Sequence, residues 1–220
     1  MRLLAAAAMI ATLTACTTGP RDRTDLRPTA DPSAVIATEL AFARAAQEKG
    51  QWTAFREYAT RDAVMFVPGP VNAQDWLRKQ TDPPRAVAWQ PHQVWSSCDG
   101  TLAVTKGAWQ RPDGSTGYFS TVWERQRNGE YEWVMDQGDQ VEQPLEAPDM
   151  IGSKVADCSS RVVPPPVVPV PDQDDSTGSS RDGTLAWAVY VGEDRSRSVQ
   201  IRYWDGTTWQ WAIMEQVAAP

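Results

Sequence analysis

The residues that could do chemistry are few in this chain of 220 residues. His92 is the only histidine, and it follows Pro91 in a predicted strand, where the proline interrupts the hydrogen-bond ladder. We therefore expect an edge or a bulge at this point, and His92 is a weak candidate for a general base. A histidine-rich metal site is ruled out, and no nucleophile elbow, phosphate-binding loop or Cys–His pair is present. The sequence predicts no metal and no cofactor.

Two carboxylates lie in the alternating segment YEWVMDQGDQV, residues 131–141. Because side chains alternate along a strand, Asp136 and Asp139 should face opposite sides unless Gly138 introduces a bulge. In the regular register the bulkier face points inward and carries Tyr131 together with the predicted pocket residues, which are Trp133, Met135, Gln137 and Asp139. Asp139 is the candidate acid or base, although its ordinary pKa of about 4 needs a buried setting to approach neutrality.

The preceding strands carry three further polar groups. Tyr118 is a weak catalytic candidate. Lys106 and Glu124 lie at mid-strand, where a surface pair across the sheet is the simpler interpretation and a catalytic couple the alternative.

Capping residues and helical spacing predict three helices that would position these groups. The first begins at Asp31-Pro32, a cap followed by a proline whose missing N–H costs nothing in the first turn, and ends at Gly50. Its residues Ile36, Leu40 and Ala43 share one face. The remaining elements before residue 81 are helices at 51–59 and, after Asn72 as cap, 73–80, with a strand at 63–67.

From Ala86 the apolar pattern changes to a period of two, which predicts four antiparallel strands up to residue 141. Asp-Gly and Asn-Gly pairs between them are strong hairpin signals. Residues 142–158 have no regular pattern, and the Pro-rich stretch 159–182 predicts a semi-stiff linker. Three short strands follow in 183–217, and they are too apolar to be left in water, so we expect this meander to pack on the main sheet or to extend it.

Nearly the same letters occur twice, as SSCDGTLA at 96–103 and as SSRDGTLA at 179–186. Either part of the fold is duplicated or one kind of turn chemistry is used twice. Both interpretations predict that each stretch opens a hairpin.

The order helix, helix, strand, helix and four-stranded meander resembles the SnoaL-like branch of the nuclear transport factor 2-like superfamily. The segments RDAVMFVPGPVNAQDWL (61–77) and YEWVMDQGDQ (131–140) carry this likeness best. The resemblance implies an α+β fold in which three N-terminal helices pack in the concave face of a curved antiparallel sheet, forming a cone around a pocket. Many related folds dimerise through the sheet, so a homodimer is a further expectation.

The resemblance also bears on activity. The family contains isomerases, cyclases, dehydratases and members without demonstrated activity, and catalytic members place an Asp or His base and a Tyr or Asp donor in the pocket. Many uncharacterised members carry histidines at the fourth and sixth positions after the closing-strand tryptophan, which here are Gln137 and Asp139. Gln137 cannot act as a base, and this departure favours binding over catalysis.

The first residues predict a lipid-anchored envelope protein. Leu3 to Leu13 is an apolar run too short to span a bilayer but of the right length for a signal-peptide core. The sequence Leu13-Thr14-Ala15-Cys16 resembles the bacterial lipoprotein box, which implies cleavage before Cys16 and lipid attachment to its thiol. Acyl chains on Cys16 would hold the protein to the membrane, and Thr17 favours the periplasmic face of the outer membrane where the host has one.

Two cysteines, Cys98 and Cys158, are then left in an oxidising compartment and predict an intramolecular disulfide. The net charge of −7 and the lack of a basic patch exclude nucleic-acid binding. Most of the 11 tryptophans lie in strand-like segments, where they suit a sheet core better than a stacking platform for sugars or peptides.

The predicted division of the chain is a signal peptide (1–15), a tether (16–30), the SnoaL-like domain (31–158), a linker (159–182) and a meander (183–217). The favoured function is an envelope lipoprotein that binds a small apolar ligand or an envelope component without catalysis. Two alternatives stay open. One is an isomerase- or dehydratase-like enzyme with Asp139 as acid or base, and the other is a protein- or glycan-interaction module that uses the Trp-rich tail.

Overall fold

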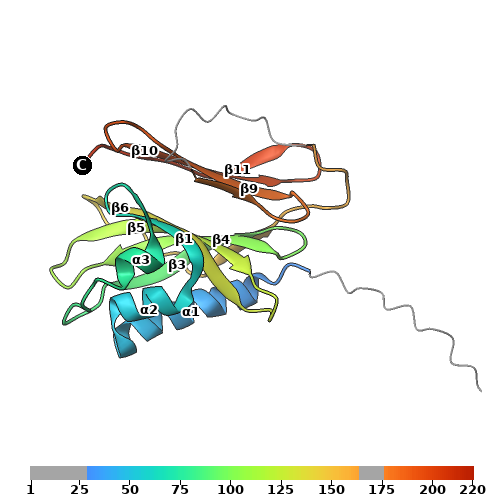
Figure 1. Ribbon diagram of the computed structural model, residues 1–220. Helices are drawn as coiled ribbons and strands as arrows, with labels where there is room; N and C mark the ends of the chain where they lie inside the picture. Colours follow the sequence, from blue (N-terminus) through green and yellow to red (C-terminus); the bar gives the residue numbers. More distant parts are fainter. Residues whose placement is uncertain (1–28, 164–175) are drawn as a thin grey trace, which may run out of the picture.

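The computed structural model describes residues 29–163 and 176–220, and Figure 1 shows that they form three layers. In this view helices lie at the bottom, a seven-stranded sheet in the middle and a four-stranded sheet at the top. The chain is therefore α+β, with few helices and a large mixed sheet. The predicted signal peptide, the lipidation residue Cys16, most of the tether and the middle of the linker lie outside the described residues.

The helices are α1 (Pro32–Lys49), α2 (Gln51–Tyr58) and α3 (Ala73–Leu77). Asp31 caps α1, since its carboxylate accepts a hydrogen bond from the backbone N–H of Ala34 at 3.1 Å. Asn72 caps α3 in the same way. The carboxylate of Asp82 accepts from two backbone N–H groups in the first turn of α2, at 2.6 and 3.1 Å. Side-chain oxygens thus satisfy N–H groups that each first turn leaves unpaired.

The buried face of α1 is not the expected one. Val35, Glu39 and Phe42 are buried, whereas Leu40 is 40 % exposed. The predicted stripe of Ile36, Leu40 and Ala43 is only partly buried, with Ile36 packed against the edge of the core. The fully buried stripe is the neighbouring one, which carries an acid. Glu39 is tolerated in the core because three side chains hydrogen-bond its carboxylate.

The main sheet has the strand order β2-β1-β6-β5-β4-β3-β7. Its strands are β1 (Ala59–Phe66), β2 (Pro70–Asn72), β3 (Ala88–Ser96), β4 (Leu102–Gln110), β5 (Thr116–Arg125), β6 (Tyr131–Val141) and β7 (Gly152–Val155). β1 pairs with β6 and β7 pairs with β3 in parallel, so the sheet is mixed rather than wholly antiparallel. β7 also corrects the expectation that 142–158 is entirely irregular.

The second sheet has the order β11-β10-β9-β8. Its strands are β8 (Ser176–Ser179), β9 (Leu185–Val191), β10 (Arg197–Trp204) and β11 (Trp209–Val217). The predicted three-stranded meander therefore has a fourth strand, β8, inside the range predicted as linker. This sheet packs face to face on the main sheet and does not extend it.

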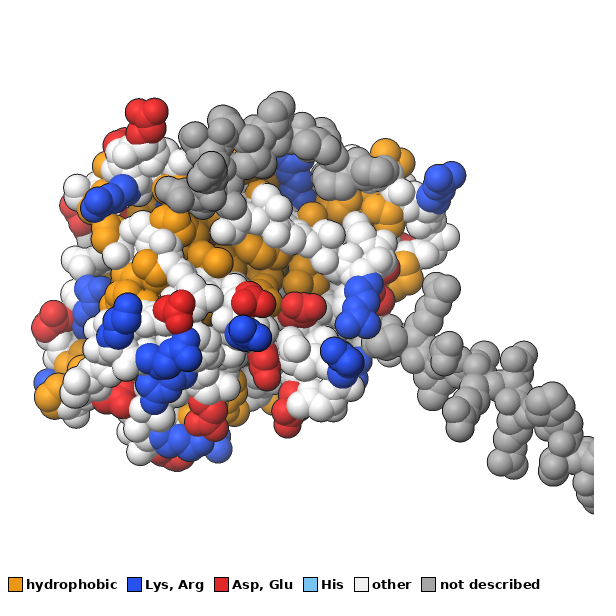
Figure 2. Space-filling model, viewed as in Figure 1, with side chains coloured by type: hydrophobic (Ala, Val, Ile, Leu, Met, Phe, Trp, Pro, Cys, Tyr) orange, Lys and Arg blue, Asp and Glu red, His pale blue; other side chains and the backbone are white. Residues whose placement is uncertain are grey.

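A separate apolar layer fills the space between the two sheets. The main sheet contributes Trp95, Leu102, Val104, Val122 and Met135, and the second sheet contributes Leu185, Trp187, Val189, Val199, Ile201 and Ile213. Figure 2 shows hydrophobic side chains gathered in the middle of one face, at the level where the sheets meet, with charged side chains below them. Trp187 and Trp204 are buried, whereas Trp211 is 44 % exposed. Two of the four tail tryptophans thus serve packing.

The two repeated stretches form the turns β3–β4 and β8–β9, as the hairpin prediction required. In each turn an Asp carboxylate accepts from the Ser hydroxyl two residues before it and from the Thr backbone N–H two residues after it. Gly100 and Gly183 occupy the same turn position with φ of 66° and 72°, a region that favours glycine. The same sequence has therefore produced the same local structure twice.

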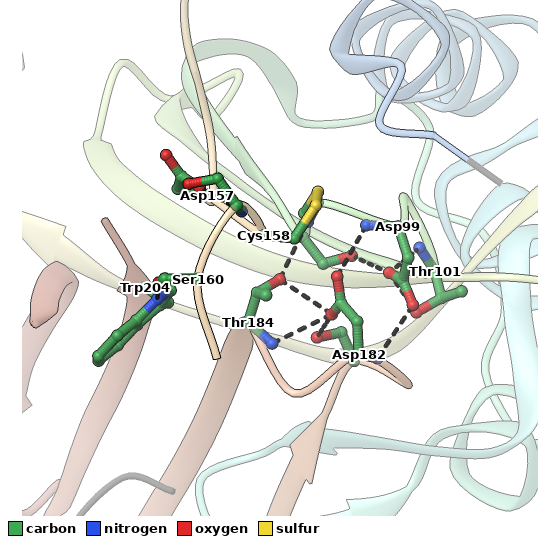
Figure 3. Close-up of a disulfide and its surroundings, with 12 residues drawn as sticks. Asp99, Thr101, Asp157, Cys158, Ser160, Asp182, Thr184 and Trp204 are labelled. Carbon is green, nitrogen blue, oxygen red and sulfur yellow. Dashed lines mark hydrogen bonds between the residues drawn. A yellow bond between two sulfur atoms is a disulfide. The ribbon is translucent and has the colours of Figure 1, made fainter. Parts of the chain in front are cut away.

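The two turns also bind each other reciprocally, and we call this contact the turn pair (Figure 3). The backbone N–H of Asp99 donates to the carboxylate of Asp182 at 2.9 Å, and that of Asp182 donates to the carboxylate of Asp99 at 3.0 Å. The Thr184 hydroxyl accepts from the backbone N–H of Cys98, and the Thr101 hydroxyl accepts from that of Arg181. The turn pair fixes one end of the second sheet on the first.

A disulfide joins Cys98, in the first turn, to Cys158, as the sequence predicted. The residues around Cys158 then cross to the second sheet. The backbone N–H of Asp157 donates to the Trp204 carbonyl at 2.9 Å, and the Trp204 indole donates to the Ser160 hydroxyl at 3.0 Å. The disulfide therefore ties the first turn to a segment that itself docks on the second sheet.

Candidate functional site

A cavity of about 570 Å³ lies between α1, α2 and the helix-facing side of the main sheet. Seven aromatic side chains line it, namely Phe42, Trp52, Phe55, Phe66, Trp89, Trp109 and Phe119. Phe42 is central among them, with its ring centroid 4.8 Å from those of Phe55 and Trp89. Near the end of β4, the Arg111 guanidinium lies 4.4 Å above the Trp109 ring and donates to Gln140 at 3.1 Å. Such a lining suits an apolar, ring-containing molecule.

Glu39 brings a carboxyl group to this apolar cavity from α1. Its oxygens accept hydrogen bonds from the Trp89 indole at 2.7 Å, the Thr105 hydroxyl at 2.6 Å and the Trp123 indole at 3.2 Å. Burial raises the pKa of Glu39, and these hydrogen bonds oppose that rise. These three hydrogen bonds fix the position of the Glu39 carboxylate.

Asp136 is the second carboxyl group of the cavity, and it comes from β6. Its Oδ2 accepts a hydrogen bond from the Thr121 hydroxyl at 2.7 Å, and no described residue donates to Oδ1. Burial raises the pKa of Asp136 to about 7, the Thr121 hydrogen bond lowers it, and the negative charge of Glu39 raises it further. An acid with this pKa can donate or accept a proton near neutral pH.

A bulge in β6 explains why the side chain of Asp136 faces the cavity. Trp123 pairs with Trp133, but the neighbouring Val122 pairs with Met135, so Val134 is the extra residue. The prediction that Trp133, Met135, Gln137 and Asp139 share one face is therefore wrong. Trp133 packs toward the helices and Met135 toward the second sheet.

The other predicted site residues are spread over the molecule. Asp139 lines the cavity near the end of β6, and its carboxylate accepts from the backbone N–H of Gln140 at 2.8 Å. The Gln137 side chain points instead to the layer between the sheets, where it donates to Glu215, although the residue also borders the cavity. Both residues thus border the cavity, and the unbroken register after Met135 places their side chains on the same face of β6, opposite to that of Asp136.

Tyr118 and His92 do not line this cavity. Tyr118 is half-buried, and burial, followed by the charges of Glu215 and Asp139, raises its pKa. His92 is skipped where the β3–β4 register shifts after Pro91, which is the bulge that the proline predicted. Burial lowers the pKa of His92.

The predicted surface pair of Lys106 and Glu124 is wrong. In the β4–β5 register Lys106 lies opposite Ser120, and Glu124 lies opposite Leu102. Lys106 instead pairs with Glu215 of the second sheet at 2.7 Å.

The sequence patterns did not identify Glu39 as a candidate, and they placed Asp136 on the face of the strand that points away from the pocket. A signal for Glu39 exists, since it is spaced four residues after Val35 and three before Phe42, in line with a buried stripe. No comparable signal marks the bulge, because Trp133, Val134 and Met135 are all apolar and either register buries them.

Within residues 29–163 and 176–220, no group of three or more His, Cys, Asp and Glu side chains is arranged to hold a metal ion. Among the helices in those ranges, none combines the length and apolar character needed to cross a membrane.

Comparison with known proteins gives structural neighbours only. No family model and no curated protein sequence matches the chain. A proposed ketosteroid isomerase from Parabacteroides distasonis aligns over 53 % of this chain and 97 % of its own, with 11 % identity and a TM-score of 0.42. A proposed aromatic ring hydroxylase from Novosphingobium aromaticivorans aligns over 52 % of this chain and 92 % of its own, with 15 % identity and a TM-score of 0.38. A protein of unknown function with a cystatin-like fold from Methylobium petroleophilum aligns over 56 % of this chain and 86 % of its own, with 10 % identity and a TM-score of 0.37.

Proposed function

We propose that this protein is a SnoaL-like envelope lipoprotein whose cavity binds a small, ring-containing apolar molecule that carries one polar group. The observation that supports this function most is the combination of seven aromatic side chains with the two carboxyl groups of Glu39 and Asp136 in one cavity. Aromatic rings supply affinity for an apolar body, and a few placed polar groups set its orientation. The Oδ1 atom of Asp136 is the contact we assign to the polar group.

The protonation state of Asp136 should select the ligand. The ionised carboxylate accepts a hydrogen bond from a hydroxyl group, whereas the protonated acid can also donate one to a carbonyl. With a pKa of about 7, the ionised fraction rises from about 10 % at pH 6 to about 90 % at pH 8.

We therefore expect 2-naphthol to bind the wild type about three to ten times more tightly at pH 8 than at pH 6, because the ionised carboxylate is the stronger acceptor for the hydroxyl. Naphthalene, which lacks the hydroxyl, should bind equally at both values. Asp136→Asn should remove the pH dependence, and Asp139→Asn should keep it. Equilibrium dialysis of both probes with the three proteins measures this. Equal pH dependence for the two probes, or no saturable binding of either, contradicts the proposed function.

Catalysis by the same acid is a second candidate function, and the pKa of Asp136 favours it over the predicted use of Asp139. The ionised Asp136 could take a proton from the carbon next to a ketone and return it two carbons further along, which moves a double bond into conjugation. Incubation with 3-cyclohexen-1-one distinguishes the candidates. Absorbance of the conjugated ketone should grow with the wild type and not with Asp136→Asn if the protein catalyses, and with neither if it only binds.

The lipid anchor is part of the proposal and rests on the sequence around Cys16. In a bacterial host, metabolic labelling with palmitate should mark the full chain and Cys158→Ser, but not Cys16→Ala. The first two proteins should also sediment with membranes. Label retained by Cys16→Ala contradicts the anchor without affecting the cavity proposal.

A further inference from the structure

Arg197 is a buried cation between the two sheets, at the first position of β10. Only 7 % of its surface is exposed, which is unusual for arginine unless its donors are satisfied. Its Nη2 donates to the backbone carbonyl of Gly138 at 2.6 Å, and its Nε donates to the Gln137 side chain at 3.3 Å. Its guanidinium carbon lies 5.2 Å from the centroid of the Phe66 ring.

Every one of these three contacts is a residue that borders the cavity. Gln137 and Gly138 directly follow Asp136 on β6, so the hydrogen bonds of Arg197 hold the strand next to this acid. Phe66, on β1, belongs to the aromatic lining. One side chain of the second sheet thus reaches the back of the cavity wall.

The charge of Arg197 is also available to the cavity. In the part of the chain that the structure describes, the nearby carboxylate Glu215 forms its ion pair with Lys106, and Arg197 makes no ion pair. Glu215 further accepts from Ser120 and Gln137, so its oxygens are occupied. A buried positive charge without a paired anion acts on the acids around it over a longer range than an exposed one.

We propose that Arg197 is a positioning residue of the cavity, which holds the Gln137–Gly138 segment of β6 and places a positive charge behind Asp136. The second sheet is then part of the functional site and not only a cover for the main sheet. This inference deepens the proposed function, because it says what controls the acid that selects the ligand.

The expected effect on Asp136 follows from the groups around it. Glu39 on α1 and Arg197 on β10 are the charged groups that act on Asp136 itself. Tyr118 on β5, Asp139 on β6 and Glu215 on β11 lie around Arg197, and Lys106 on β4 pairs with Glu215. Glu39 and Arg197 act on Asp136 with opposite signs, Glu39 raising its pKa and Arg197 lowering it. Removing the positive charge should therefore raise the pKa of Asp136 above its value in the wild type.

The test measures the protonation of Asp136 without any ligand. Aspartate labelled with ¹³C in the carboxyl group gives a signal that shifts on titration, and Asp136→Asn identifies the signal of Asp136. We expect Arg197→Gln and Arg197→Met to raise its midpoint. Methionine keeps an unbranched apolar stem against Phe66, which favours folding. The matched control is Arg202→Gln, since Arg202 lies on the same strand but stacks on Trp211, 3.8 Å from its ring centroid, and it should leave the midpoint unchanged.

An unchanged midpoint in a folded charge-free variant overturns the proposal, as does an equal shift in Arg202→Gln. Unfolding of both charge-free variants, shown by circular dichroism, would make Arg197 a structural residue and also overturn it. Failure of 2-naphthol to bind the wild type would count against the proposed function alone, because the titration of Asp136 needs no ligand.

Discussion

A protein that ends at Val163 should melt about 10–20 °C below the full chain, or should aggregate when it is concentrated. The deletion of 164–220 removes the second sheet and exposes the outer face of the main sheet. Five apolar side chains of that face, Trp95, Leu102, Val104, Val122 and Met135, lose their cover. Each contributes about 1.5–3 kcal/mol when buried. The deletion therefore removes about 8–15 kcal/mol of stabilisation, before the entropy of ordering the tail is subtracted.

Differential scanning calorimetry and size-exclusion chromatography of the two proteins measure the effect. A matched pair of point variants separates packing from chain length. Ile213 faces the main sheet and Met214, next to it on β11, is 63 % exposed. Ile213→Ser should lower the melting temperature, while Met214→Ser should leave it nearly unchanged. A truncated protein that melted like the full chain would make the tail an independent unit and favour the interaction-module function.

Replacing both cysteines of the disulfide, Cys98→Ser with Cys158→Ser, should lower the free energy of unfolding by about 4 kcal/mol in the chain-entropy description of a loop of this length. The bond closes a separation of 60 residues. Its loss also frees the segment that docks on Trp204, so the second sheet should loosen with it. Urea unfolding of the wild type and the double variant measures the difference as a lower midpoint, with a steeper slope because the denatured chain without the bond exposes more surface.

Cys16→Ala serves as the control for this experiment, because it removes a cysteine outside the disulfide. Thiol counting on the denatured, unreduced Cys16→Ala protein should find no reactive cysteine. Two reactive thiols would contradict the disulfide, and an unchanged urea midpoint in the double variant would contradict its contribution to stability.

Local signals in the sequence predicted much of the fold, because capping and turn chemistry act within a few residues. Asp31 and Asn72 cap helices where they were expected to, and Pro91 marks a bulge. Strand pairing was less readable. The parallel pairing of β7 with β3 involves the four residues Gly152–Val155, whose alternation is too short to detect. Whether the tail packs on a sheet or extends it depends on long-range packing, which periodicity does not report.

The candidate site was predicted less well than the fold, and for a physical reason. Its position in the sheet depends on a single inserted residue, Val134, which reverses every side chain that follows it on β6. Glu39 was overlooked because a carboxylate on a helix is ordinarily solvated, and only the tertiary donors Trp89, Thr105 and Trp123 make its burial tolerable. That both acids line one cavity depends on contacts between elements distant in sequence, which local patterns do not predict.

The turn pair has a consequence for how this architecture could be acquired. Each turn gives the other the same donors and acceptors that it receives, which is the isologous arrangement that identical subunits form about a two-fold axis, here within one chain. A contact between unlike surfaces needs two sequences that fit each other. A self-complementary turn needs only one sequence, because a second copy at the right distance already has the donors and acceptors that bind the first copy. The repeated sequence SS-x-DGTLA thus determines both the conformation of the turn and the surface on which a second sheet can bind.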